Sequence, residues 1–109
     1  MKLLHFVAAA GTDEHYVPAD KVTMVEITDS ATCTVWWANS DTDVSDHKVV
    51  LTTTAGKADE CLLAISEQLL DTGIASHGVQ LIRASKYLPN SYKFNANRNL
   101  NSVVYTAGS

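Results

Sequence analysis

The sequence predicts one small α+β domain, in which an antiparallel β-meander sheet of about five or six strands carries a single amphipathic helix on one face. Three observations predict this fold class. The chain has 109 residues, which is the size of one domain with a two-layer core. Apolar residues make up 46% and charged residues 18%, a composition typical of globular proteins. The hydrophobic period changes from two to 3.6 only once, so residues 1–109 are expected to form one domain with one helix among strands.

Several segments have the composition of short β-strands. They are rich in Val, Ile, Thr, Tyr and Trp and are separated by clusters of Gly, Asp, Asn and Ser. Five precede the helix and two follow it: residues 3–8, 15–17, 21–28, 32–38, 47–53, 79–84 and 102–106. Pro18 has no amide hydrogen to donate, so strand pairing should be interrupted just before Lys21. Residues 39–46 are expected to form a longer polar hairpin loop.

The helix is predicted over residues 57–71. Its apolar side chains recur at a helical period and form one stripe, consisting of Ala58, Leu62, Ile65 and Leu69. Asp59 and Glu60 fall in the early turns, where carboxylates interact favourably with the positive end of the helix dipole.

The strand at 32–38 has apolar residues on both faces, although one helix can cover only one face of a sheet. Cys33, Val35 and Trp37 alternate with Thr32, Thr34 and Trp36. Trp36 and Trp37 therefore cannot both point into the same core. We expect the second face to be covered by the segment after Gly78 or by another subunit.

Charge is distributed unevenly along the chain. Residues 1–71 contain all twelve acidic and four basic residues, a net charge of −8, whereas residues 72–109 contain four basic residues and no acidic one, a net charge of +4. Two interpretations follow. The basic segment can lie across the acidic meander of its own chain, or the asymmetry can favour head-to-tail or ring association between chains.

The basic segment also suggests nucleic-acid binding. Between residues 83 and 98, Lys86-Tyr87 and Tyr92-Lys93-Phe94 interleave cations with rings that could stack on single-stranded bases. The net charge of −4 argues against this interpretation, because four cations make only a thin basic face.

No pattern indicates catalysis, a metal or a cofactor. Asn39, Asp41 and Asp43 alternate as calcium ligands do, but Val44 and Val50 occupy the positions that an EF-hand gives to Gly and Glu. A looser cation site at this loop stays open beside the alternative of a solvated hairpin tip. The four histidines lack zinc-ligand spacing, and no nucleophile or phosphate-loop motif is present.

The two cysteines and the first residues bear on the compartment. Cys33 and Cys61 are expected to be buried thiols, which favours a reducing compartment. Residues 1–11 look like a signal peptide in outline, but His5 interrupts the apolar stretch, so a first strand is expected. We expect a cytoplasmic protein with no membrane partner, because no stretch approaches the ~20 apolar residues of a spanning helix.

The layout of the first two thirds resembles that of small uncharacterised proteins of tailed phages, particularly marine ones. The resemblance rests on Lys2-Leu3-Leu4-His5-Phe6 followed by a turn, on residues 16–22 and 50–53, and on the single amphipathic helix after them. It implies a non-enzymatic virion or accessory protein that works as an oligomer, in the host cytoplasm or in the virion.

The sequence thus predicts a non-enzymatic structural or interaction module that forms a homo-oligomer. The alternative is a protein that binds single-stranded nucleic acid through residues 83–98. Aromatic anchors dominate the energetics of interfaces, and complementary charges add to them. The predicted interface residues are Trp36, Tyr87, Tyr92, Lys93, Phe94 and Arg98.

Overall fold

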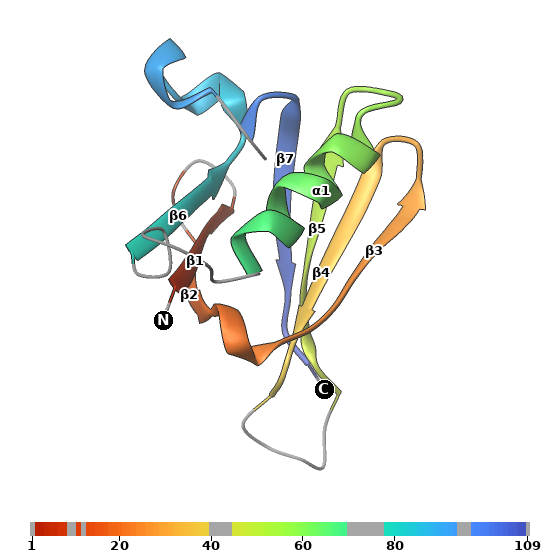
Figure 1. Ribbon diagram of the computed structural model, residues 1–109, viewed down its shortest axis with the longest axis vertical. Helices are drawn as coiled ribbons and strands as arrows, with labels where there is room; N and C mark the ends of the chain where they lie inside the picture. Colours follow the sequence, from red (N-terminus) through yellow and green to blue (C-terminus); the bar gives the residue numbers. More distant parts are fainter. Residues whose placement is uncertain are drawn as a thin grey trace.

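The computed structural model describes residues 2–8, 11, 13–39, 45–69, 78–93 and 97–108, and it has an α+β fold (Figure 1). The strands are β1 (Lys2–Ala8), β2 (Asp13–Pro18), β3 (Val22–Asp29), β4 (Thr32–Trp37), β5 (His47–Thr53), β6 (Gly78–Arg83) and β7 (Leu100–Thr106). Short 3-10 helices are η1 (Ala19–Lys21), η3 (Ser85–Tyr87) and η4 (Asn90–Tyr92). Each segment predicted as a strand is one, and the α-helix α1 spans Ala58–Leu69.

The strands form two sheets, so the prediction of one antiparallel meander is wrong. A small sheet has the order β2-β1-β6, and a large sheet has the order β3-β4-β5-β7. The chain leaves the small sheet at Pro18, where η1 turns it towards β3. Because Pro18 has no amide hydrogen, the pairing of β2 ends at this point and the next strand can join a different sheet.

The small sheet is mixed rather than antiparallel. Its central strand, β1, pairs antiparallel with β2 and parallel with β6, so that Phe6 lies opposite His15 on one side and Ile82 on the other. Parallel neighbours require a long crossover, and here the connection from β1 to β6 includes the whole large sheet except β7. Local patterns in the sequence contain no information about such a distant pairing.

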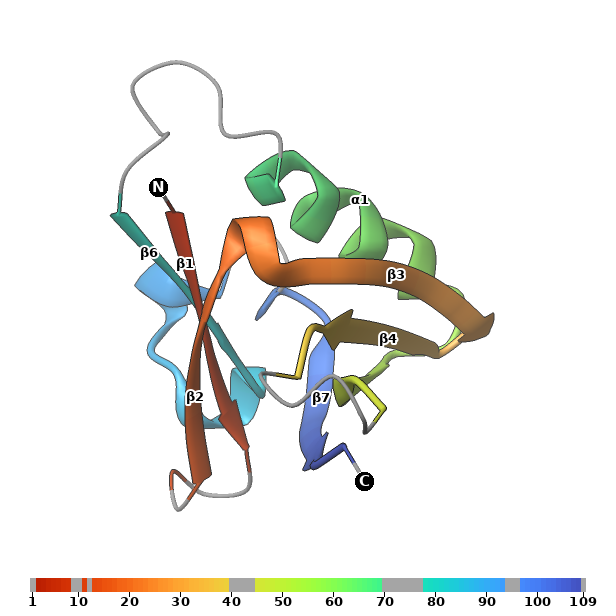
Figure 2. The same cartoon turned by 90° about the horizontal axis from the view of Figure 1, so that it is seen from below.

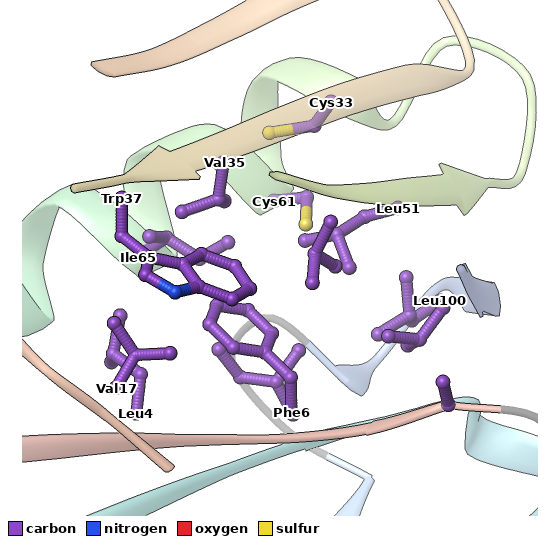
Figure 3. Packing of buried hydrophobic residues seen from close by; sticks show 14 residues of the cluster. Leu4, Phe6, Val17, Cys33, Val35, Trp37, Leu51, Cys61, Ile65 and Leu100 are labelled. Carbon is purple, nitrogen blue, oxygen red and sulfur yellow. The ribbon is translucent and has the colours of Figure 1, made fainter. Parts of the chain in front are cut away.

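One face of the large sheet, the inner face, is covered by two different elements. Helix α1 packs on β3, β4 and β5, whereas the small sheet lies near β7 (Figures 1 and 2). Alternate residues of β4 and β5 point into the core, and α1 contributes its predicted apolar stripe. Figure 3 shows how Phe6 from the small sheet packs against Trp37 from the large sheet. Their rings are stacked, and the ring centroids are 5.7 Å apart.

The free edge of β6 is closed by a side chain. Asn97 is buried, and its Oδ1 accepts a hydrogen bond from the Arg83 amide at 2.9 Å. Its Nδ2 donates to the Leu81 carbonyl, also at 2.9 Å. The side-chain amide thereby takes the place of a neighbouring strand at these two backbone groups.

Ile65 and Leu63 test the packing of α1, because one is fully buried and the other is 60% exposed on the same helix. We expect Ile65→Ala to lower the free energy of unfolding by about 2–5 kcal/mol, since it leaves a cavity in the core. Leu63→Ala should stay within about 0.5 kcal/mol of the parent protein. Urea unfolding monitored by tryptophan fluorescence measures both values, and equal effects would contradict the packing described here.

Candidate interaction surfaces

The residues predicted for an interface lie on different elements. Trp36 belongs to β4, Tyr87 to η3, and Arg98 to the turn before β7, while Lys93 follows η4 and is exposed. Only the backbone of Tyr92 is described, and Phe94 lies outside the described residues. Within the described part of the chain, no hydrogen bond, ring contact or ion pair joins any two of the six. Their role at an interface stays a prediction.

Trp36 and Trp37 point to opposite faces of the large sheet, as the alternation of the strand requires. Trp37 is 8% exposed in the core, whereas Trp36 is half-buried on the other face. We call this other side of the large sheet the outer face. The described strands after Gly78 do not cover it, since β6 joins the small sheet and β7 extends the large one. Figure 2 shows no helix or strand of the described chain against it.

Apolar side chains cross the outer face from one edge strand to the other. The strand register places Met24 opposite Trp36, and Val50 opposite Val104. Met24 is 46% and Val104 53% exposed, whereas Val50 is half-buried between neighbours. Large apolar side chains that stay exposed on a sheet are a common feature of interaction surfaces.

Lys48 lies over the Trp36 ring, with its ammonium nitrogen 5.1 Å from the ring centroid. The ring nitrogen of Trp36, Nε1, is buried and has no hydrogen-bond partner within the described residues. Trp36 therefore contributes apolar surface and a cation–π contact rather than a hydrogen bond.

A second surface is a groove of about 440 Å³ beside β7, which we call the β7 groove. One side consists of residues 101–105 of β7, and the other of Ala8, Asp13, Ala84, Lys86 and Tyr87. Successive side chains of a strand point to opposite faces. A groove that touches five consecutive residues therefore follows the edge of β7 rather than one of its faces.

Hydrogen bonds and stacked rings support the end of the groove near Asp13. Nε2 of His15 lies 2.8 Å from Oδ1 of Asp13, and the His15 ring stacks on Tyr105 at 3.7 Å. Nδ1 of His47 accepts the amide hydrogen of Gly108 at 3.1 Å. The Tyr105 hydroxyl oxygen lies 3.0 Å from the same nitrogen.

Among the predicted interface residues whose side chains the structure describes, Tyr87 alone lines the β7 groove. The sequence did not indicate that β7 forms the opposite side of the groove. Cζ of Arg83 and Nζ of Lys86 each lie 5.1 Å from the centroid of the Tyr87 ring. A nucleic-acid base that stacked here would compete with two cations for the same ring. Nucleic-acid binding through residues 83–98 stays a prediction.

The ion pairs do not join the acidic and basic parts of the chain. In the described residues they are His5–Glu14, His15–Asp13 and Lys57–Glu60, all within residues 1–71. Arg98 lines a cavity beside α1 together with Glu60 and Glu67, but forms no ion pair with them.

The predicted cation loop falls largely outside the described residues, which exclude Asp41 and Asp43. Nδ2 of Asn39 donates to the carbonyl of Ser45 at 3.3 Å. His5 and His15 lie on neighbouring strands, but the register places Tyr16 opposite His5, so the two rings are on opposite faces. Within the described chain, no group of three or more His, Cys, Asp or Glu side chains is arranged to hold a metal ion.

Cys33 and Cys61 are free thiols in the core, on β4 and α1 (Figure 3). The thiol hydrogen bond to Cys33 and burial among apolar side chains raise the pKa of Cys61 well above its ordinary value of 9.0. A buried neutral thiol of this kind is a structural group rather than a nucleophile.

Comparison with known proteins returned no relatives: no family model matches the chain, and neither a curated protein nor a solved structure is significantly similar to it. Among the described helices, none is long and apolar enough to span a bilayer.

The raised pKa of Cys61 predicts a loss of stability at high pH. The folded chain keeps this proton, while the unfolded chain releases it above pH 9. The contribution of the Cys61 thiol to the free energy of unfolding is therefore complete below pH 9 and falls as the pH rises further. The slope contributed by one thiol is at most about 1.4 kcal/mol per pH unit. The hydrogen bond to Cys61 lowers the pKa of Cys33 and opposes this effect in the parent protein, so the test is made without Cys33. Urea unfolding between pH 8 and pH 10 should show a steeper decline for Cys33→Ala, in which burial still raises the pKa of Cys61, than for the double variant Cys33→Ala/Cys61→Ala. Parallel declines would show that the thiol is not held neutral by the fold.

Proposed function

We propose that this protein is a non-enzymatic interaction module that self-associates through the outer face of its large sheet. The observation that carries the proposal is Trp36, which lies with Met24, Val50 and Val104 on a sheet face that no described element covers. An aromatic side chain among other apolar side chains on an uncovered face is the kind of residue that dominates interface energetics.

The charges on this face favour a second copy as the partner. Glu26 lies on β3 two residues after Met24, and Lys48 lies on β5 opposite Trp36, so both point outward. In a two-fold contact, the same patch must complement itself. A copy laid on this face can bring its Lys48 near Glu26, while the apolar side chains meet between them.

The wider charge distribution supports association between chains. The acidic residues of 1–71 and the basic residues of 72–109 are not neutralised by ion pairs with each other in the described structure. Contacts between copies would bring opposite charges together and would weaken as salt screens them. Because the sequence resembles small phage proteins, we also propose that such an assembly belongs to a phage particle. The comparisons with known proteins provide no support for this part of the proposal.

Trp36→Ala tests the proposal directly. Light scattering at low and high salt should give the parent protein a multiple of the monomer mass, with weaker association at high salt. Trp36→Ala should return the mass to that of a monomer, because it removes the central apolar side chain. Trp36→Phe should retain the assembly, since the Trp36 nitrogen has no hydrogen-bond partner to lose in the described structure.

Val79→Ala is the matched control, because Val79 is also an exposed strand residue, at 57%, but belongs to the small sheet. The solution mass of the Val79→Ala protein should equal that of the parent protein. A parent protein that is monomeric at both salt concentrations would overturn the proposal. Dissociation by Val79→Ala but not by Trp36→Ala would place the contact on the small sheet instead.

A further inference from the structure

We propose that the β7 groove binds an extended peptide segment with acidic side chains, which adds to the free edge of β7 as an extra strand. This second activity is separate from self-association, because the groove faces the edge of the large sheet and the proposed contact uses its outer face. Ser102 and Val104 line the groove and also lie on the outer face.

The first step of the argument is that the edge of β7 is open. β7 pairs with β5 on one side only, as the last strand of the large sheet. In the part of the chain that the structure describes, no backbone–backbone hydrogen bond joins the other edge of residues 101–105 to another segment. Asn97 closes the comparable edge of β6, and none of the described side chains does the same at β7. Unpaired amide and carbonyl groups along an edge are a template for strand addition.

The second step concerns the shape of the occupant. Facing β7 across the groove are Ala8 and Asp13 at the adjoining ends of β1 and β2, and Ala84, Lys86 and Tyr87 in and before η3. Another sheet placed edge to edge with β7 would bring further strands into the space of this wall. A single extended chain needs only one strand spacing of about 4.8 Å beside β7. The wall therefore favours a lone peptide segment over the sheet edge of a second copy.

The third step concerns charge. Asp13 is paired with His15, with 2.8 Å between the carboxylate oxygen and the ring nitrogen. Lys86 on the same wall has no carboxylate partner among the described residues, and its ammonium nitrogen lies over the Tyr87 ring. Because its ammonium group has no carboxylate partner there, Lys86 favours an acidic side chain on the peptide at its own end of the groove.

The fourth step concerns the apolar lining. Ala8, Ala84, Val103 and Val104 line the groove together with the Tyr87 and Tyr105 rings. An added strand points alternate side chains to opposite faces, so apolar and acidic residues can alternate along it. The volume of about 440 Å³ lies within the usual range of about 300–1,000 Å³ for binding pockets.

A capped five-residue peptide that alternates valine and glutamate is the probe for this site. We expect its titration, followed by backbone amide shifts in NMR spectra, to perturb residues 101–105 most strongly. Lys86→Glu should weaken binding about threefold or more, because it replaces an attraction with a repulsion at a partly exposed site. Lys93→Glu makes the same charge change outside the groove and should bind the peptide as the parent protein does.

Two modified probes separate strand addition from general adhesion. A peptide with lysine in place of glutamate should bind at least threefold more weakly, because it repels Lys86. A peptide N-methylated at alternate residues should not bind, because it lacks the amide hydrogens that pair with the edge of β7. Equal binding of the methylated peptide, or shifts confined to the outer face, would overturn the inference.

The titration is also made on Trp36→Ala, so that the groove is tested independently of self-association. Binding by both proteins supports the inference, whether or not the parent protein is an oligomer. Binding by Trp36→Ala alone would show that another copy already fills the groove, and the proposal of a separate peptide partner would then be wrong. Failure of both proteins to bind would overturn the inference and leave the self-association test unaffected.

Discussion

The stacking of Phe6 on Trp37 joins the two sheets, and the rest of the structure depends on this contact. Phe6 lies in the central strand of the small sheet and Trp37 at the end of β4, so their burial brings together strands that are distant in sequence. Since α1 covers only β3, β4 and β5, the remainder of the inner face would stay exposed without the small sheet. Apolar burial of this kind supplies most of the driving force for folding.

This arrangement determines which surfaces are left open. With Trp37 directed inward, the pleat of β4 directs Trp36 outward, to a face that neither α1 nor the small sheet reaches. The small sheet also accounts for the β7 groove, because the ends of β1 and β2 and the residues after β6 form its facing wall. The two proposed surfaces thus follow from the same packing, one from a face and the other from an edge.

The local elements were predictable because their signals are local. The period of 3.6 located α1, and residues rich in β-branched and aromatic side chains located the strands. The pairing of strands was not predictable in the same way. A meander was the simplest interpretation of consecutive strands. In the structure, however, β6 pairs with β1 in the small sheet, and β7 pairs with β5 in the large sheet. The sequence also could not indicate Asn97, whose role exists only because β6 became an edge strand.

For the candidate sites, the sequence by itself determined that Trp36 and Trp37 lie on opposite faces, because alternation along a strand requires no knowledge of its neighbours. It also determined the separation of acidic and basic residues along the chain. Only the tertiary structure decided that the face of Trp36 is the uncovered one, and that Tyr87 and Lys86 meet the open edge of β7. The physical reason is that coverage and edges are properties of strand order and packing between sheets, which arise from contacts between residues far apart in the chain.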